Sequence, residues 1–245
     1  MRIDVLTIFP RMFEGVFGES IIKRAQEKNA AIINVHDIRE YSDDKHKRVD
    51  DYPYGGGAGM VMMVQPFHAA LEAVKKTATS TPLVCLMCPR GKVLDQALVK
   101  RLAEVDHLVL IAGHYEGYDE RVREFCDEEI SLGDFILTGG ELPAMVVTDA
   151  IIRLLPNVLG DEMSAVDESF SDYLLEYPQY TRPREYQGLS VPEVLFSGHH
   201  ANVAKWRRMQ ALKITLKNRP DLLEKYKPTT ADEKLLKEIR AELKK

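Results

Sequence analysis

The sequence predicts an α/β fold, with a mostly parallel sheet and helices on both faces, followed by a small all-α domain. Over residues 1–160, short apolar runs alternate with apolar residues at helical spacing, which is typical of such a sheet. Residues 161–176 are polar and acidic, and beyond them the spacing is helical only. We therefore expect an α/β domain over 1–160, a linker over 161–176 and a helical domain over 177–245.

The individual elements follow from these patterns. Four apolar runs predict buried strands at residues 3–8, 83–86, 108–112 and 130–132. Helical spacing predicts the helices of the first domain, whose apolar positions are Ile21, Ile22 and Ala25, then Leu94, Leu98, Val99 and Leu102, then Val122 and Phe125, and finally Leu142 to Leu155 before Pro156. In the second domain, residues 203–216 and 235–243 predict two amphipathic helices.

Composition indicates a cytoplasmic globular protein. The chain has 245 residues, of which 45% are apolar and 29% charged, as in ordinary soluble proteins. It has neither a continuous apolar run of about 18 residues nor a charged-then-apolar leader, so we expect no membrane association. Cys85, Cys88 and Cys126 are too few for a disulfide framework, and Cys85 and Cys88 lack the second pair that a zinc site needs.

The net charge of −5 argues, taken alone, against a nucleic-acid binder. Its distribution does not, because residues 194–220 hold no Asp or Glu. The basic side chains of that stretch are Lys205, Arg207, Arg208, Lys213, Lys217 and Arg219. A local basic face can bind phosphates on an acidic protein, since surface fields decay within about a Debye length. The alternative is a solvated helix face.

Two glycine-rich stretches follow strand-like runs, at residues 113–121 and 132–143. Open α/β sheets bind ligands at the carboxyl ends of their strands, so the two loops together favour a ligand cleft over simple helix caps. No Gly-x-Gly-x-x-Gly follows the first strand, which makes a standard NAD site less favoured. A third glycine block, residues 55–60, lacks the Gly-Lys-Ser/Thr of a P-loop.

Together these stretches resemble the bacterial tRNA (guanine-N1)-methyltransferases, which belong to the SPOUT class. The resemblance extends along nearly the whole chain, including Asp50-Asp51-Tyr52-Pro53-Tyr54-Gly55-Gly56-Gly57-Ala58-Gly59-Met60. It implies a trefoil-knotted fold, S-adenosylmethionine as methyl donor, and methylation of N1 of the guanine immediately 3′ of the anticodon in tRNA. It also implies a homodimer and assistance by Mg²⁺, although the sequence shows no dedicated metal cage.

The resemblance assigns the cofactor loops residue by residue. Residues matching the S-adenosylmethionine pocket of the family, with their neighbours in the same loops, are Leu86, Pro89, Gly113, Tyr115, Glu116, Gly117, Leu132, Gly133, Asp134, Phe135, Ile136, Leu137, Gly139, Gly140 and Pro143. Glu116 is placed to accept hydrogen bonds from ribose hydroxyls. Capping of the next helix is the alternative role of that carboxylate.

Methylation at guanine N1 requires a general base, because N1 carries a proton, and a cation near O6 to stabilise the developing charge. The family segment ends Asp-Ser-Phe, with that Asp as base. Here the residues are Asp167-Glu168-Ser169-Phe170, which places Glu168 at the base position with Asp167 as the substitute. Arg153, a charge on an otherwise apolar helix, matches the arginine proposed at O6.

The RNA contacts are expected in two places. Near the glycine block they are His46, Arg48, Asp50 and Gly59, and in the helical domain they are Ser197, Lys205, Arg207 and Arg208. Ser197 has the alternative role of a plain helix cap. Two other functions stay open: a methyltransferase of the same class with another RNA target, and a non-catalytic tRNA-binding relative.

Overall fold

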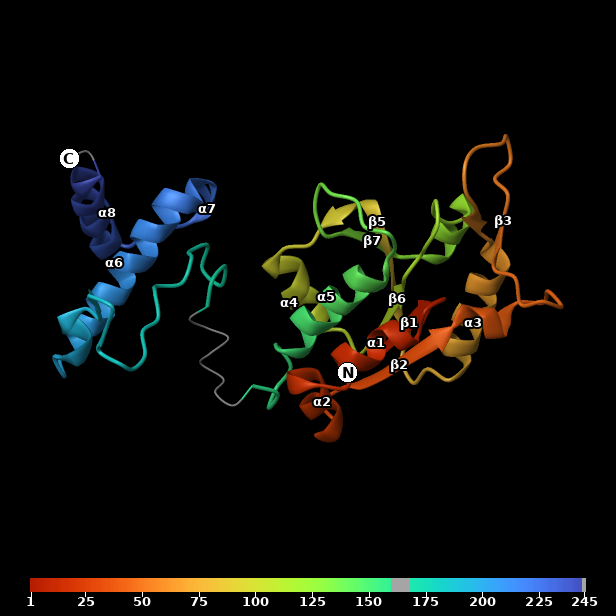
Figure 1. Cartoon of the computed structure of the whole chain (residues 1–245), viewed down its shortest axis with the longest axis horizontal. Coiled ribbons are helices and arrows are strands. Elements are labelled where there is room, and N and C mark those ends of the chain that lie inside the picture. The colour runs from red at the N-terminus through yellow and green to blue at the C-terminus, as the bar shows by residue number, and fades with distance from the viewer. Residues whose placement is uncertain (160–167, 244–245) are drawn as a thin grey trace. The chain divides into compact units, whose positions relative to one another are not determined.

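The computed structural model describes residues 1–159 and 168–243. The chain divides into two compact units, Met1–Glu162 and Met163–Lys245, each drawn in Figure 1. Asp167 and residues 161–166 of the predicted linker lie outside the described residues. The remainder of that linker packs within the second unit, where the side chain of Leu174 is 5% exposed and belongs to the core. The predicted domain boundaries stay predictions.

The first unit is built on a parallel sheet, which confirms the predicted fold class. In the described residues the sheet has five strands in the order β2-β1-β6-β5-β7, and every neighbouring pair is parallel. The strands are β1 (Arg2–Thr7), β2 (Ile32–Asp37), β5 (Leu83–Val93), β6 (His107–Ile111) and β7 (Glu128–Ser131). The trefoil knot stays a prediction.

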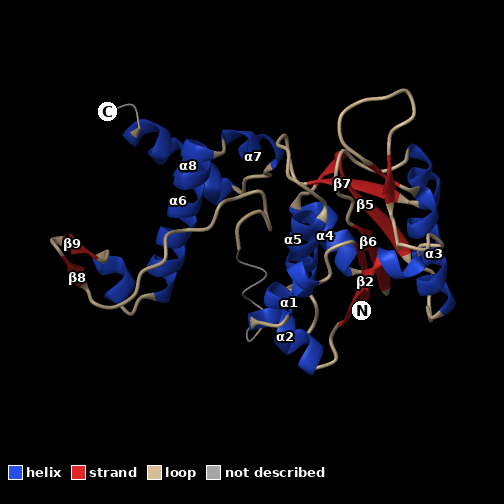
Figure 2. Ribbon diagram, turned by 45° about the vertical axis from the view of Figure 1, so that its right-hand side comes forward, coloured by secondary structure: helices blue, strands red, loops and turns tan. Residues whose placement is uncertain are grey.

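Helices cover both faces of this sheet because its side chains alternate between two apolar cores. Leu108 and Leu110 belong to one core, and Val109 and Ile111 to the other. Figure 2 shows α1, α2, α4 and α5 on one side of the sheet and α3 on the other. The elements are α1 (Arg11–Phe17), α2 (Ser20–Glu27), η1 (Ile38–Tyr41), α3 (Val64–Lys76), α4 (Gln96–Ala103), η2 (Glu120–Phe125) and α5 (Glu141–Ile152).

Strand β5 continues past the point where the sequence predicted its end. Met87 pairs with Ile130, and so does Lys92, because the register shifts between them. Residues 88–91 therefore leave the ladder as a bulge, and the sheet resumes at Val93 opposite Ser131. Pro89 and Gly91 lie in this bulge, where proline and glycine are tolerated better than inside a regular ladder. The bulge places Cys88 and Pro89 beside the loops that follow β6 and β7.

A short hairpin carries the third glycine block. Its strands are β3 (Asp50–Asp51) and β4 (Val61–Met62), which pair antiparallel. Residues 52–60 form the loop between them, and Tyr54 at its tip is fully exposed. A hydrogen bond from Gly56 N to Pro53 O, 3.2 Å, closes a turn in which Gly55 has φ +86°. This positive φ favours glycine and fixes the tip of the loop.

The second unit is helical, as predicted, with one small hairpin in addition. Its core contains Leu212 and Ile239, both completely buried. The elements are β8 (Glu185–Tyr186), β9 (Leu189–Ser190), η4 (Glu193–Phe196), α6 (His200–Asn218), α7 (Pro220–Lys225) and α8 (Thr230–Glu242). Thr229 and Asp232 form a capping box that begins α8. None of the described helices is long and apolar enough to cross a membrane.

Candidate functional site

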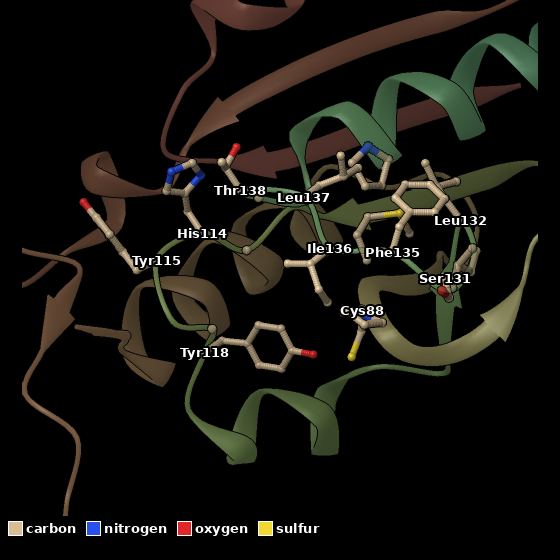
Figure 3. Close-up of a pocket in the computed structure, with 18 of the residues that line it drawn as sticks. Cys88, His114, Tyr115, Tyr118, Ser131, Leu132, Phe135, Ile136, Leu137 and Thr138 are labelled. Carbon is tan, nitrogen blue, oxygen red and sulfur yellow. The ribbon is translucent and has the colours of Figure 1, made fainter. Parts of the chain in front are cut away.

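The bulge in β5 and the two glycine loops enclose a pocket of about 290 Å³ at the carboxyl end of the sheet (Figure 3). Its position matches the place where open α/β sheets bind ligands. The lining residues are Met87, Cys88, Pro89, Gly113, His114, Tyr115, Glu116, Gly117, Tyr118, Ile130, Ser131, Leu132, Gly133, Phe135, Ile136, Leu137, Thr138, Gly139, Gly140 and Pro143. Most of these are apolar residues or glycines, so backbone groups and apolar walls shape the pocket.

Gly140 closes the inner wall of the pocket, where the two glycine loops meet. Its N–H donates to Gly113 O at 2.7 Å, which ties the loops together. A Cβ atom added at Gly140 would lie 2.8 Å from Ala112 Cα and 3.1 Å from Met87 Cβ. The backbone angle φ is an ordinary −83°, so glycine is needed here for close approach rather than for an unusual conformation.

The structure brings together the predicted cofactor residues, except two. Leu86 is completely buried in the core beneath the sheet, and Asp134 is exposed outside the lining. The other predicted cofactor residues all line the pocket. Leu86 misses the pocket because strand side chains alternate, and its neighbour Met87 faces the pocket instead.

Seven lining residues were not predicted: Met87, Cys88, His114, Tyr118, Ile130, Ser131 and Thr138. His114 and Tyr118 lie inside the first glycine loop and Thr138 inside the second, so the loops themselves carried the signal. Cys88 gave none, because the bulge that exposes it to the pocket depends on the pairing of β5 with β7.

Cys88 and Tyr118 form a polar corner of the pocket. Arg123 Nη2 lies 3.3 Å from both Cys88 Sγ and the Tyr118 hydroxyl, and Figure 3 shows that hydroxyl directed toward Cys88. Burial acts to raise the pKa of the Cys88 thiol, but hydrogen bonds from Tyr118, Arg90 and Arg123 outweigh it and lower the pKa. Burial raises the pKa of Tyr118. The corner therefore offers a polarised thiol to a bound ligand.

A buried carboxylate supports the opposite end of the pocket. Glu141, at the start of α5, is 1% exposed. Its Oε1 accepts a hydrogen bond from Thr7 Oγ1 at 3.0 Å, and its Oε2 lies 3.2 Å from His114 Nδ1. The His114 ring also makes an edge contact with the ring of Phe9, with centroids 4.8 Å apart. The ring is thus held from two sides.

The hairpin loop is fastened to the rim of the same pocket. Glu116 N donates to Met60 O at 3.1 Å, and Met62 N donates to Gly117 O at 2.9 Å. A Cβ at Gly59 would lie 2.7 Å from Glu116 Oε1, so this glycine admits the Glu116 side chain. The predicted RNA-contact residues His46 and Arg48 are exposed at the other end of the hairpin, where Arg48 pairs with Asp44 at 2.9 Å, and Asp50 is half-buried in β3.

Arg153 is the residue that follows α5, and it is half-buried. Its backbone N–H donates to Asp149 O at 3.3 Å. The residue therefore occupies the C-cap position of α5, at the end of the helix where cations are favoured by the helix dipole.

The predicted base Glu168 lies in the second unit, in a pocket of about 530 Å³. Residues 168–177 and one face of α6 form this pocket, and Tyr177, His200, Arg207 and Arg208 line it too. Leu175 N donates to Thr215 Oγ1 at 2.8 Å, which fastens the segment to the helix. The structure thus gathers the predicted base and two predicted RNA-contact arginines in one place.

The two arginines differ in their contacts. Arg208 Nε lies 2.8 Å from Asp232 Oδ1, and its guanidinium also bonds the Tyr226 hydroxyl. Arg207 is exposed, and its guanidinium lies over the ring of Tyr177, 4.8 Å from the centroid. The Arg208 contacts join α6 to α8, whereas Arg207 and the exposed Lys205 face solvent.

Ser197 precedes α6 by three residues, since the helix begins at His200. Its hydroxyl donates to Val194 O at 2.8 Å and accepts from His199 N at 3.2 Å. These bonds form a local turn between η4 and α6. The N-cap residue of α6 is His199, and no side chain caps that helix, so the structure does not give Ser197 the role of helix cap.

Magnesium was expected from the family resemblance. Among residues 1–159 and 168–243, no group of three or more His, Cys, Asp or Glu side chains is arranged to hold a metal ion. We therefore assign no residue to Mg²⁺.

Comparison with known proteins places the chain in a family. The model of the family described as "tRNA (Guanine-1)-methyltransferase TrmD" matches residues 1–225. A protein named tRNA (guanine-N(1)-)-methyltransferase from Halalkalibacterium halodurans is 55% identical over 246 residues, covering 100% of both chains. Proteins of the same name from Bacillus pumilus and Staphylococcus carnosus are 56% and 54% identical, covering 96% and 100% of this chain and 96% and 99% of their own. The chain therefore belongs to the tRNA (guanine-1)-methyltransferase family.

Proposed function

We propose that the protein transfers a methyl group from S-adenosylmethionine to N1 of the guanine immediately 3′ of the anticodon in tRNA. The observation that carries the proposal is the pocket formed by both glycine loops and the β5 bulge, in a chain that is 55% identical over its full length to a protein of that name. A cytoplasmic location is part of the proposal, since the substrate is tRNA.

The residues of the pocket fit S-adenosylmethionine. Apolar walls from Leu132, Leu137 and Pro143 suit an adenine ring, and the Glu116 carboxylate can accept from the ribose hydroxyls. The glycine at position 140 leaves the space that a side chain would take. When bound, the cofactor supplies a methyl group on a sulfonium centre.

The chemistry requires one proton transfer and one displacement. Guanine N1 loses its proton to a carboxylate, which we assign to Glu168, and N1 then forms a bond to the methyl carbon as the sulfur–methyl bond breaks. The electron pair of that bond stays on sulfur, so the products are S-adenosylhomocysteine and N1-methylguanosine. A general base contributes about 10²–10⁴-fold. Arg153 is assigned to the charge that develops on O6.

Exposed aromatic residues near the pocket of the first unit, and exposed basic residues of the second unit, support an RNA substrate. Tyr52 and Tyr54 are 79% and 101% exposed on the loop that is fastened to Glu116. A base in a single-stranded loop can be unstacked and recognised on aromatic side chains, which a duplex does not allow. In the second unit, Lys205 and Arg207 add positive charge without a nearby acid on their own stretch of α6.

A homodimer belongs to the same proposal. Met12 and Val16 on α1 are 44% and 43% exposed, and Leu142 and Val146 on α5 are 47% and 46% exposed. Residues four apart share one helix face, and α1 packs beside α5, so we assign these four exposed side chains to one candidate interaction surface. A Val16→Asp, Val146→Asp double variant should elute as a monomer in light-scattering chromatography.

The test is transfer of labelled methyl from S-adenosylmethionine to an unmodified tRNA transcript with guanine 3′ of the anticodon. A matched transcript carries adenine at that position, and mass spectrometry locates the product. Label at N1 of the guanine transcript alone supports the proposal. Label at another nucleotide would indicate a different RNA target, and tRNA binding without any label would indicate a non-catalytic relative.

A further inference from the structure

The Glu141 carboxylate has no part in the chemistry described above, although it lies directly behind the wall of the cofactor pocket. It is 1% exposed, and burial of a carboxylate is costly unless its oxygens are paired. Thr7 satisfies Oε1, and His114 Nδ1 lies 3.2 Å from Oε2. His114 is thus the side chain of the described pocket lining that contacts this buried carboxylate.

The contact fixes how the imidazole ring is protonated. A carboxylate accepts hydrogen bonds, so Nδ1 of His114 is the donor to Glu141 and carries a proton. Phe9 and Tyr115 contact the ring at its edges, with centroids 4.8 and 5.4 Å away. Glu141 is thus a positioning residue that holds the ring, and Nε2 is the nitrogen left for a ligand.

His114 is the residue of the described pocket lining that can take up a positive charge. The lining, which falls wholly within the described residues, contains neither Lys nor Arg. A protonated imidazole donates from both nitrogens, so Nε2–H can bind an anion while Nδ1–H stays with Glu141. The methyl donor carries one anionic group, the α-carboxylate of its methionyl part.

We propose that His114, whose ring is positioned by the contact of Nδ1 with Glu141, binds the α-carboxylate of S-adenosylmethionine through Nε2–H. The inference rests on the proposed function, because it assumes that this pocket holds the methyl donor. The competing interpretation is structural: the His114–Glu141 bond only joins the first glycine loop to α5, and a bound ligand never touches the ring.

The experiment compares two ligands that differ by the carboxylate alone. Isothermal titration of the full-length protein measures the affinity for S-adenosylhomocysteine and for decarboxylated S-adenosylhomocysteine, which keeps the ammonium group. The variants are His114→Ala, His114→Lys and Glu141→Gln. His199→Ala, which removes an exposed histidine in the second unit, is the matched control.

We expect His114→Ala to weaken S-adenosylhomocysteine by about 10- to 100-fold, the effect of one charge-assisted hydrogen bond, and to leave the decarboxylated ligand within about twofold. His114→Lys should restore part of the preference for the carboxylate. Glu141→Gln should reduce that preference by about threefold through the loss of its charge beside the ring. The control should match the wild type.

Equal weakening of both ligands by His114→Ala would establish the structural interpretation and overturn the proposal. So would an unchanged affinity for both, or a wild type that binds the two ligands equally. A wild type that binds neither ligand would instead contradict the proposed function, so the two failures are distinguishable.

Discussion

The two units of the chain each contain a pocket, and the pockets are built differently. Turns of the backbone, glycines and apolar side chains line the pocket of the α/β unit. The pocket of the helical unit combines apolar residues with six ionisable side chains, which are Glu168, Asp172, Glu176, His200, Arg207 and Arg208. A wall of buried backbone suits a small ligand of fixed shape, whereas mobile charged side chains suit a phosphate backbone and a reacting base. Under the proposed function, this difference implies that the methyl donor and the RNA are recognised by different means.

The same contrast extends to the groups that stabilise each unit. Asp4 in β1 is completely buried and binds Arg2, His36 and His107 at 2.6–2.7 Å. Asp232 in α8 is 3% exposed and binds Arg208 and Thr229. In each case burial acts to raise the pKa of the carboxyl group, but its hydrogen bonds outweigh burial and hold the pKa well below the usual range.

Removal of the Asp4 charge should have the largest effect. Asp4→Asn leaves Arg2 and two histidines without their buried carboxylate partner, which costs about 3–5 kcal/mol of the free energy of unfolding. Because the folded pKa lies below the unfolded value of about 3.9, ionised Asp4 stabilises the unit above about pH 4, and this contribution is lost as the pH falls further. The free energies of unfolding of variant and wild type, measured in urea, should therefore differ by this full amount at pH 7 and become equal in acid.

Asp232→Asn provides the comparison for that prediction. It should weaken the helical unit and leave donor binding unchanged, whereas Asp4→Asn should destabilise the unit that holds the donor pocket. A single unfolding transition that shifts equally in both variants would contradict the description of two separately stabilised units.

A side chain added to the inner wall of the donor pocket should have the next largest effect, which is on donor affinity. Gly140→Ala places a methyl group against Ala112 and Met87, so the loops must separate. We expect affinity for S-adenosylhomocysteine to fall by about 100-fold, or about 2.7 kcal/mol, with tRNA affinity preserved. Calorimetric titration measures the first and filter binding the second. Gly15→Ala, where an added Cβ meets nothing within 4 Å, is the control. Wild-type donor affinity in Gly140→Ala would show that the donor binds elsewhere.

Substitution of the two neighbouring arginines of α6 should have the smallest effects. One substitution should affect tRNA binding and the other should affect stability. Arg207→Ala should lower tRNA affinity several-fold and reduce the salt dependence of binding by about one unit of slope, as expected for one phosphate contact. Arg208→Ala should lower the free energy of unfolding by about 1 kcal/mol, a value discounted for the partial exposure of its ion pair with Asp232. If Arg208→Ala alone reduced the salt slope, the two roles would be exchanged.

The sequence predicted most of the α/β unit because buried strands and helix faces are written in local apolar patterns. It did not predict β2, an edge strand whose Asn34 and His36 point their polar atoms to Asp4 rather than into an apolar core. Nor did it predict the small hairpins, whose strands are two residues long.

The same limit applies to the sites. The glycine loops were recognisable from sequence because glycine allows backbone conformations and close approaches that other residues do not. The bulge in β5 depends on pairing with β7, in which Met87 and Lys92, 43 and 38 positions earlier in the chain, both pair with Ile130. The role of Arg208 depends on Asp232, and that of His114 on Glu141. These contacts join residues 24 and 27 positions apart, so no local sequence pattern predicts them.

The central claim is the proposal that the target guanine loses its N1 proton to Glu168 and takes its methyl group from a donor bound in the pocket of the first unit. The most direct test is the single-turnover rate of methyl transfer by Glu168→Gln with donor and tRNA both saturating, beside Asp167→Asn. We predict a fall of about 10²–10⁴-fold in Glu168→Gln, with donor and tRNA affinities unchanged, and near wild-type transfer in Asp167→Asn. A wild-type rate in Glu168→Gln together with loss in Asp167→Asn would contradict the account.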